Sequence, residues 1–179
     1  MAACGQLGLA FSPSLNKNST HLISASVLGP KYVVAVRNHV PVLRPDWILT
    51  SAERGQLEPE APYLLRPLHG LRVAVTGQVF DVVVRERISD LVGQLGGELM
   101  AGLSETCNYL IAASVHTEKF HACCSGAHPE LSKVKIVSCG FLEACLRSGT
   151  RVHEGPYLMA RPEPCLSACV IAVAPRSAS

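Results

Sequence analysis

The segment LISASVLGPKY at residues 22–32 returns as LIAASVHTEKF at residues 110–120, 88 positions later (110 − 22). Leucine, isoleucine, alanine, serine, valine and lysine recur in place, and an aromatic residue follows the lysine in both copies. At the same offset, GQLG at residues 5–8 matches GQLG at residues 93–96. Matched segments in the same order indicate a duplicated unit.

The match continues after the lysine with an offset of 94. Trp47 then aligns with Phe141, and EAPYL at residues 60–64 aligns with EGPYL at residues 154–158. The six extra residues of the second unit (94 − 88) fall between positions 120 and 137, where GAHPELSK predicts a loop. A period of about 90 residues suits a small domain rather than a solenoid repeat.

The second unit contains a complete series of strand and helix patterns. Short apolar runs predict strands over residues 71–75, 98–103, 109–113 and 135–137. Helical spacing and capping signals predict helices over residues 82–95, from Thr117 onward, and over residues 140–147. Gly96-Gly97 and Gly149 are placed to end two of these helices. The order β-α-β-β-α-β-α is typical of a largely parallel sheet covered on both faces.

The first unit has no counterpart of the strand at residues 71–75, because subtracting 88 from Leu71 gives a position before Met1. A sheet without this strand would leave backbone groups unpaired, so we expect residues 1–65 to be poorly stable alone. Three explanations stay open. The sequence is a fragment or a truncated gene product, the first unit is degenerate and packs on the second, or the tail segment ACVIAVA at residues 168–174 supplies the strand.

Composition and charge narrow the range of functions. Apolar residues make up 48% of the 179-residue chain, which predicts a globular fold. The net charge of +2 is too weak to predict sequence-independent binding to nucleic acid, which needs a basic stripe. The N-terminus does not have the pattern of a secretory signal, and no apolar run approaches the roughly 18 residues of a membrane-spanning helix.

The eight cysteines form no C-x-x-C pair, which favours reduced thiols in an intracellular protein. Five potential metal ligands lie close together in the sequence: His116, His121, Cys123, Cys124 and His128. Their spacing matches no standard zinc site, so we predict no metal and no cofactor. No motif for Cys-His nucleophilic catalysis is present either.

Four features together resemble the BRCT family. They are LHGLRVAVTG at residues 68–77, the Gly96-Gly97 turn, NYLIA at residues 108–112 with the later Lys-aromatic pair, and a last helix that opens on Phe141 or Trp47. The resemblance covers residues 1 to about 160, and two units joined by the linker at residues 65–68 resemble the tandem BRCT modules of DNA-damage mediator proteins.

The resemblance implies an α/β fold of two BRCT-like repeats, each with a small parallel four-stranded sheet flanked by three helices. The chain then divides into an incomplete repeat over residues 1–65, a complete repeat over residues 69–160 and a C-terminal tail over residues 161–179. The incomplete repeat would lack its first strand and most of its first helix. The leucines and alanines of the repeated phrase are expected to lie in the core of both repeats.

The resemblance also implies a phosphate pocket. In this family a Ser or Thr hydroxyl and the next glycine N–H, at the end of the first strand, act with a lysine that begins the second helix. These positions correspond to Thr76, Gly77 and Lys119. A phosphate carries nearly two negative charges and suits one cation with neutral donors. A Thr-Gly turn and a solvated lysine are also common, so residue types alone leave a purely structural role open.

Three further basic residues are accessory candidates. Arg85 and Arg87 open the first helix of the complete repeat, although a solvated helix face also explains them. Lys31 is the counterpart of Lys119 in the first repeat, but it has no Thr-Gly partner there. The pocket is therefore expected in the second repeat, with Thr76 and Lys119 at a solvent-facing rim.

The implied role is a non-enzymatic, nuclear adaptor that binds phosphorylated Ser or Thr segments of DNA-damage or replication proteins, without direct contact to DNA. Two alternatives stay open at this point. One is a protein-interaction module that does not need phosphate, and the other is a fragment of a larger DNA repair enzyme.

Overall fold

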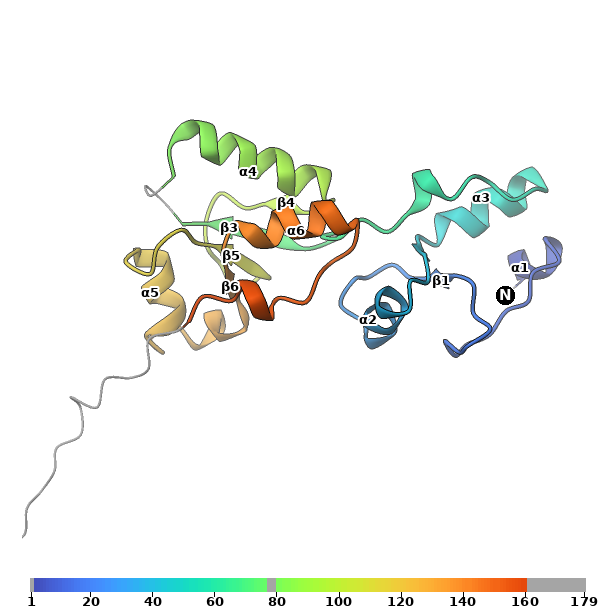
Figure 1. The fold of residues 1–179 in the computed structure, drawn as a ribbon, viewed down its shortest axis with the longest axis horizontal. Coiled ribbons are helices and arrows are strands. Elements are labelled where there is room, and N and C mark those ends of the chain that lie inside the picture. Colours follow the sequence, from blue (N-terminus) through green and yellow to red (C-terminus); the bar gives the residue numbers. More distant parts are fainter. Residues whose placement is uncertain (1, 77–79, 161–179) are drawn as a thin grey trace, which may run out of the picture.

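The computed structural model describes residues 2–76 and 80–160. In the second repeat, four parallel strands form a sheet in the order β4-β3-β5-β6 (Figure 1). The strands are β3 (Arg72–Val75), β4 (Glu98–Leu99), β5 (Tyr109–Ile111) and β6 (Lys135–Val137). Strand β3 is central, since Val73 aligns with Leu99 on one side and with Tyr109 on the other.

Helices cover both faces of this sheet. Helices α4 (Val82–Gln94) and α6 (Gly140–Ser148) pack on the face that carries Val73 and Val75. Helix α5 (Glu118–Cys124) packs on the opposite face, where Phe120 contacts the core around Ala74. The predicted parallel α/β architecture is therefore confirmed.

Local signals explain where these helices begin and end. Asp81 caps α4 by accepting a hydrogen bond from the Val84 N–H at 2.7 Å, and Thr117 caps α5 by accepting one from the Phe120 N–H at 3.3 Å. Gly149 ends α6 in the left-handed conformation, with φ of 66°. The predicted GAHPELSK loop contains a short 3-10 helix, η2 (Pro129–Lys133).

Strands β4 and β5 are shorter than the sequence predicts. Residues 98–103 were expected to be extended, but β4 ends at Leu99. Strand β4 lies at the edge of the sheet. Among the described residues it pairs with Arg72 and Val73 alone, and its ladder ends where the Met100 N–H bonds to the Val73 carbonyl.

The first repeat contains the same elements in reduced form. It comprises α1 (Ala2–Gln6), β1 (Leu22–Ile23), α2 (Pro30–Arg37), β2 (Val42–Leu43), α3 (Asp46–Arg54) and the 3-10 helix η1 (Ala61–Tyr63). Strands β1 and β2 are parallel, as β5 and β6 are. A bridge from Leu43 to Leu64 has its counterpart between Val137 and Leu158, at the predicted offset of 94 (137 − 43 and 158 − 64).

The first repeat has an open sheet edge. In the second repeat the Ile111 carbonyl accepts a hydrogen bond from the Thr76 N–H. Ile23 is the counterpart of Ile111, and among the described residues no strand lies along its free edge. Ile23 is accordingly 38% exposed whereas Ile111 is fully buried. The expectation that the leucines and alanines of the repeated phrase are core in both repeats is wrong, because Leu28 is 54% exposed. Residues 168–174, the candidate replacement strand, lie outside the described residues.

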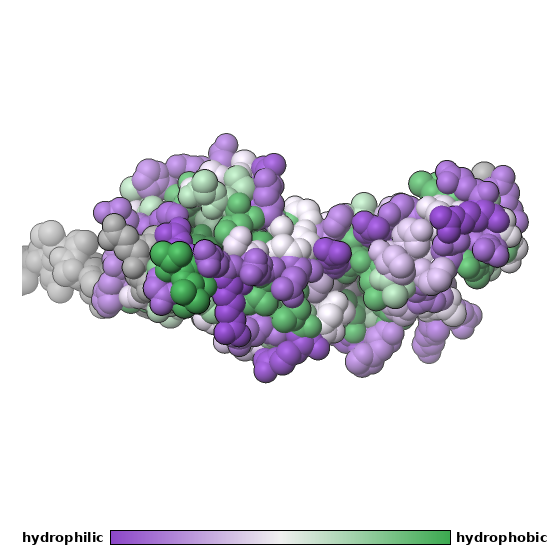
Figure 2. All heavy atoms as spheres, turned by 90° about the horizontal axis from the view of Figure 1, so that it is seen from above, coloured by the Kyte–Doolittle hydropathy of each residue, from purple (hydrophilic) through white to green (hydrophobic). Residues whose placement is uncertain are grey.

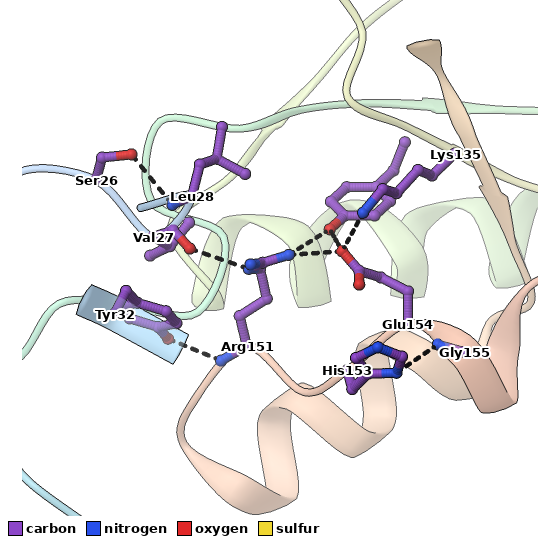
Figure 3. Close-up of polar contacts among 10 residues, drawn as sticks. Ser26, Val27, Leu28, Tyr32, Lys135, Arg151, His153, Glu154 and Gly155 are labelled. Carbon is purple, nitrogen blue, oxygen red and sulfur yellow. Dashed lines mark hydrogen bonds and ion pairs between the residues drawn. The ribbon is translucent and has the colours of Figure 1, made fainter. Parts of the chain in front are cut away.

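The two repeats meet at Arg151 (Figure 3). From its own backbone, Arg151 donates an N–H to the Tyr32 hydroxyl at 2.9 Å, and its Nε donates to the Val27 carbonyl at 3.2 Å. Its Nη1 donates to Glu154 at 2.6 Å and to the Tyr109 hydroxyl at 3.1 Å. Val27 and Tyr32 are buried in one hydrophobic cluster with residues of the second repeat. Arg151 thus joins polar groups of both repeats across a shared apolar core.

Glu154 is the carboxylate at this junction. Its Oε1 also accepts hydrogen bonds from the Tyr109 hydroxyl at 2.6 Å and from Lys135 Nζ at 2.9 Å. Burial disfavours the charged form, but these hydrogen bonds and the charge of Arg151 outweigh it and lower the pKa of Glu154 to about 2. In the folded protein Glu154 therefore stays ionised at pH values well below 4.5, which is its ordinary pKa.

We predict that the two repeats differ in autonomous stability. Residues 66–160 should fold cooperatively, because they contain the whole four-stranded sheet and its three helices. Residues 1–65 alone should show no cooperative transition, since β1 and β2 then lose the packing of Tyr32 and Val27 against the second repeat. Urea denaturation of each segment, followed by circular dichroism, tests this. A cooperative transition in residues 1–65 would contradict it.

We also predict that acid destabilises the protein through Glu154. Its pKa is depressed on folding, so its contribution is present above about pH 4.5 and is lost as the pH falls toward about 2. The contribution is about 2–3 kcal/mol, and Glu154→Gln should remove it and flatten the acid profile. Chemical denaturation between pH 2 and 7 measures both effects.

Glu98→Gln is the control for this titration, because Glu98 forms an exposed ion pair with Arg72 at 3.2 Å. Such surface pairs contribute little, so Glu98→Gln should keep the slope of the parent protein. An unaltered slope in Glu154→Gln would show that other carboxylates cause the acid sensitivity.

Candidate functional site

The carboxyl end of β3 and the first turn of α5 meet in the second repeat. Thr76 follows β3 and extends its ladder, because its N–H donates to the Ile111 carbonyl at 2.9 Å. Lys119 lies in the first turn of α5, two residues after the Thr117 cap. Its Nζ donates to the Val75 carbonyl at 2.8 Å, so the structure brings the ammonium of Lys119 to the residue that precedes Thr76.

Thr76 is completely buried, and its hydroxyl has no hydrogen-bond partner among the described residues. The expectation that Thr76 lies at a solvent-facing rim is therefore wrong. The physical reason is that its backbone continues the central strand of the sheet. A buried hydroxyl without a partner costs about 1–3 kcal/mol, and such a group calls for an explanation such as a ligand that completes it.

Gly77 was also predicted for the phosphate pocket, and Arg85 and Arg87 were predicted as accessory residues. Gly77 lies outside the described residues. Arg85 and Arg87 lie on α4 and are exposed, and no described contact joins them to Thr76 or Lys119. Their placement agrees with a solvated helix face.

Lys31 occupies the position in α2 that Lys119 occupies in α5, but it reaches a different partner. Its Nζ donates to the Pro13 carbonyl, which lies in a segment without regular structure. The first repeat therefore holds its lysine on a loop carbonyl, and the second repeat holds its lysine on the end of a central strand.

An apolar surface follows the site in the sequence. Val82 and Val83, in the first turn of α4, are 71% and 73% exposed. Figure 2 shows hydrophobic surface in this part of the second repeat. The chain that leaves Thr76 thus reaches an exposed apolar helix end within about six residues.

Three further properties of the described residues concern thiol reactivity, metal binding and membrane-spanning helices. Burial raises the pKa of the Cys139 and Cys145 thiols, which disfavours the reactive thiolate at these positions. Within residues 2–76 and 80–160, no three His, Cys, Asp or Glu side chains come together in a way that could hold a metal ion. None of the described helices is both long and apolar enough to cross a membrane.

Sequence reasoning missed two features. One is the Arg151 junction, whose partner Tyr32 is 119 positions away. The other is an open groove of about 480 Å³ that Lys119 lines together with residues of η2 and of the segment before β5. The Arg151 junction had a partial signal in the sequence, because its carboxylate, Glu154, opens the EGPYL segment that aligns with EAPYL. The groove had no such signal.

Comparisons with known proteins agree with this architecture. Residues 2–47 match a family model described as the twin BRCT domain. The crystal structure of Rad4 BRCT1,2 in complex with a Crb2 phosphopeptide is 22% identical, with a TM-score of 0.74 over 88% of this chain and 87% of that chain. Rad4 BRCT1,2 in complex with an Mdb1 phosphopeptide is 21% identical, with a TM-score of 0.76 over 89% and 88%. The predicted resemblance to tandem BRCT proteins is confirmed, and the fold is that of a tandem BRCT module.

We predict that Thr76→Val stabilises the protein. Valine has nearly the shape of threonine and lacks the unpaired hydroxyl, so the free energy of unfolding should rise by about 1 kcal/mol. The matched control is Thr117→Val, which removes the hydroxyl that caps α5 and should destabilise the protein by about 1 kcal/mol. Urea denaturation of the two variants measures this difference in sign. Destabilisation by Thr76→Val would show that its hydroxyl has a partner in solution.

Proposed function

We propose that this protein is a non-enzymatic adaptor that binds phosphorylated Ser or Thr segments of proteins in DNA-damage or replication-checkpoint signalling, in the nucleus. The phosphate contacts the Thr76 hydroxyl and the Lys119 ammonium in the second repeat. The Gly77 N–H, predicted from the sequence, is the third donor. Arg85 and Arg87 remain solvated.

The observation that supports this proposal most is the unpaired, buried hydroxyl of Thr76 beside the lysine that is anchored on Val75. A lysine ammonium has three N–H donors, and one of them is used on the Val75 carbonyl. Within the described residues, two donors are left for an incoming anion. A phosphate oxygen would give the Thr76 hydroxyl an acceptor, so one ligand would resolve both features.

The comparisons support the same ligand class. Rad4 BRCT1,2 was crystallised with phosphopeptides from two proteins, Crb2 and Mdb1, and it shares the tandem fold over most of both chains. At 21–22% identity this likeness concerns the fold alone. The proposal for the phosphate pocket therefore rests on the residues of this chain.

A protein-interaction module that does not need phosphate is the second candidate. The observation that favours it is the free edge of β1, where Ile23 is exposed and no described strand pairs with it. An exposed edge can accept a strand from another protein through backbone hydrogen bonds. This mode would be insensitive to phosphate and to Lys119.

We predict that Lys119→Glu and Thr76→Val each weaken phosphopeptide binding about tenfold or more. Lys119→Glu places a repulsive charge at the phosphate, and Thr76→Val removes one donor. A hydrogen bond to a charged group contributes roughly 1.5–3 kcal/mol, which corresponds to at least about tenfold in Kd. Fluorescence anisotropy with labelled phosphothreonine peptides and their unphosphorylated counterparts measures the change.

Lys31→Glu is the matched control, since it makes the same charge change at the equivalent helix position of the first repeat. It should leave phosphopeptide affinity within about twofold of the parent protein, as expected for a screened, distant charge. If Lys31→Glu abolished binding and Lys119→Glu did not, the pocket would belong to the first repeat. Equal affinity for phosphorylated and unphosphorylated peptides would favour the second candidate.

A further inference from the structure

We propose that the groove beside Lys119 selects phosphopeptides that carry a lysine or arginine close to the phosphorylated residue. This inference rests on the proposed function, because Lys119 is shared by the phosphate site and the groove. We name this surface the acidic groove and define it by Glu105, Glu118 and Glu130 together with Leu103, Ala122 and Leu131.

The acidic groove is formed by three parts of the second repeat. Helix α5 contributes one wall through Glu118 and Ala122, η2 contributes Glu130 and Leu131, and the segment before β5 contributes Leu103 and Glu105. Its volume of about 480 Å³ is sufficient for one or two peptide side chains, and it is open to solvent. Lys119 lines it, so a peptide whose phosphate contacts Lys119 lies within reach of the groove.

Two of the three carboxylates of the groove have no charged partner among the described residues, and the third contacts a histidine. Within the described residues, neither Glu105 nor Glu118 forms an ion pair, and both side chains are exposed. Glu130 lies 3.1 Å from His128 Nδ1. A hydrogen bond from its own backbone N–H, and then the contact with His128, lower the pKa of Glu130. Glu130 is therefore ionised at neutral pH.

These charges decide which flanking residues the site accepts. With His128 neutral, three carboxylates and Lys119 give the groove lining a net charge of −2 (−3 + 1). Carboxylates near a phosphate oppose its binding, so a peptide that supplies only the phosphate meets partial repulsion. A lysine or arginine next to the phosphorylated residue cancels this repulsion and gains attraction, whereas an acidic neighbour adds to it.

The apolar part of the groove fits the same ligand. Leu103 and Ala122 are partly buried, and Leu131 is buried. Lysine and arginine place a long apolar stem against such a surface while the charged end reaches polar groups. An extended chain advances about 3.3 Å per residue, so the basic residue should lie within about three residues of the phosphosite, on one side of it.

The test uses the full chain and a matched set of fluorescent peptides. Each peptide carries one phosphothreonine in an alanine-serine background, with arginine, alanine or glutamate at one position up to about three residues away. At one or more positions on one side, arginine should bind about fivefold more tightly than alanine, and glutamate should bind more weakly. This is the size expected for one cation near several exposed carboxylates. The arginine preference should decrease with added salt.

The double variant Glu105→Lys/Glu118→Lys should reverse the preference, so that the glutamate peptide becomes the tighter ligand. Glu143→Lys is the matched control, because Glu143 is an exposed residue of α6, which packs on the opposite face of the sheet from α5. Glu143→Lys should keep the preference of the parent protein.

The outcomes separate this inference from the function on which it rests. Phosphate-dependent binding that is equal for the arginine, alanine and glutamate peptides at every position would overturn the inference and leave the proposed function intact. An arginine preference that survives the double variant would also overturn it, since the selecting charges would lie elsewhere. Loss of phosphate dependence in all peptides would overturn both.

Discussion

The structure depends on pairing both edges of the central strand β3. Strand β3 hydrogen-bonds to β4 on one side and to β5 on the other, and it carries Val73 and Val75 to one core and Ala74 to the second core. Because a parallel strand has no hairpin partner, its position is fixed only when helices cover both faces of its sheet. Helix α5 must therefore pack on the Ala74 face, and this packing brings Lys119 to the Val75 carbonyl. The candidate site is a direct result of how β3 is held.

The first repeat shows what changes where the described residues include no such strand. Strands β1 and β2 pair as β5 and β6 do, yet each has only two residues, and residues 10–11, which correspond to β4, form no strand. The exposed fraction of Ile23 rises because its sheet edge has no described neighbour. Tyr32 and Val27 are buried in a cluster that both repeats share, and Arg151 of the second repeat bonds to both. The first repeat thus relies on tertiary packing for order that a central strand would otherwise provide.

The sequence predicted the elements of the second repeat well, because each has a local cause. Apolar runs, the Thr117 cap and the Gly149 end all act within a few residues, and the structure confirms them. The burial of Thr76 was not predicted, because a strand-end residue can face solvent or core depending on how far the ladder continues. The Arg151 junction joins residues 119 positions apart, and the acidic groove takes one glutamate from each of three separate segments. Neither leaves a periodic pattern, so the three-dimensional fold is needed to bring their residues together.

Burial of Thr76 alters how the candidate site should be understood. An exposed threonine would exchange water for phosphate, and its hydroxyl would gain little on binding because water already satisfied it. A buried hydroxyl without a partner has lost its water at the folding step, so the desolvation cost is already part of the stability of the protein. A phosphate oxygen that reaches this hydroxyl recovers that cost. Lys119 acts in the same direction, since its bond to Val75 fixes the ammonium before a ligand arrives. The second repeat is therefore less stable than an apolar residue at position 76 would make it, and under the proposed function a bound phosphate would recover this loss.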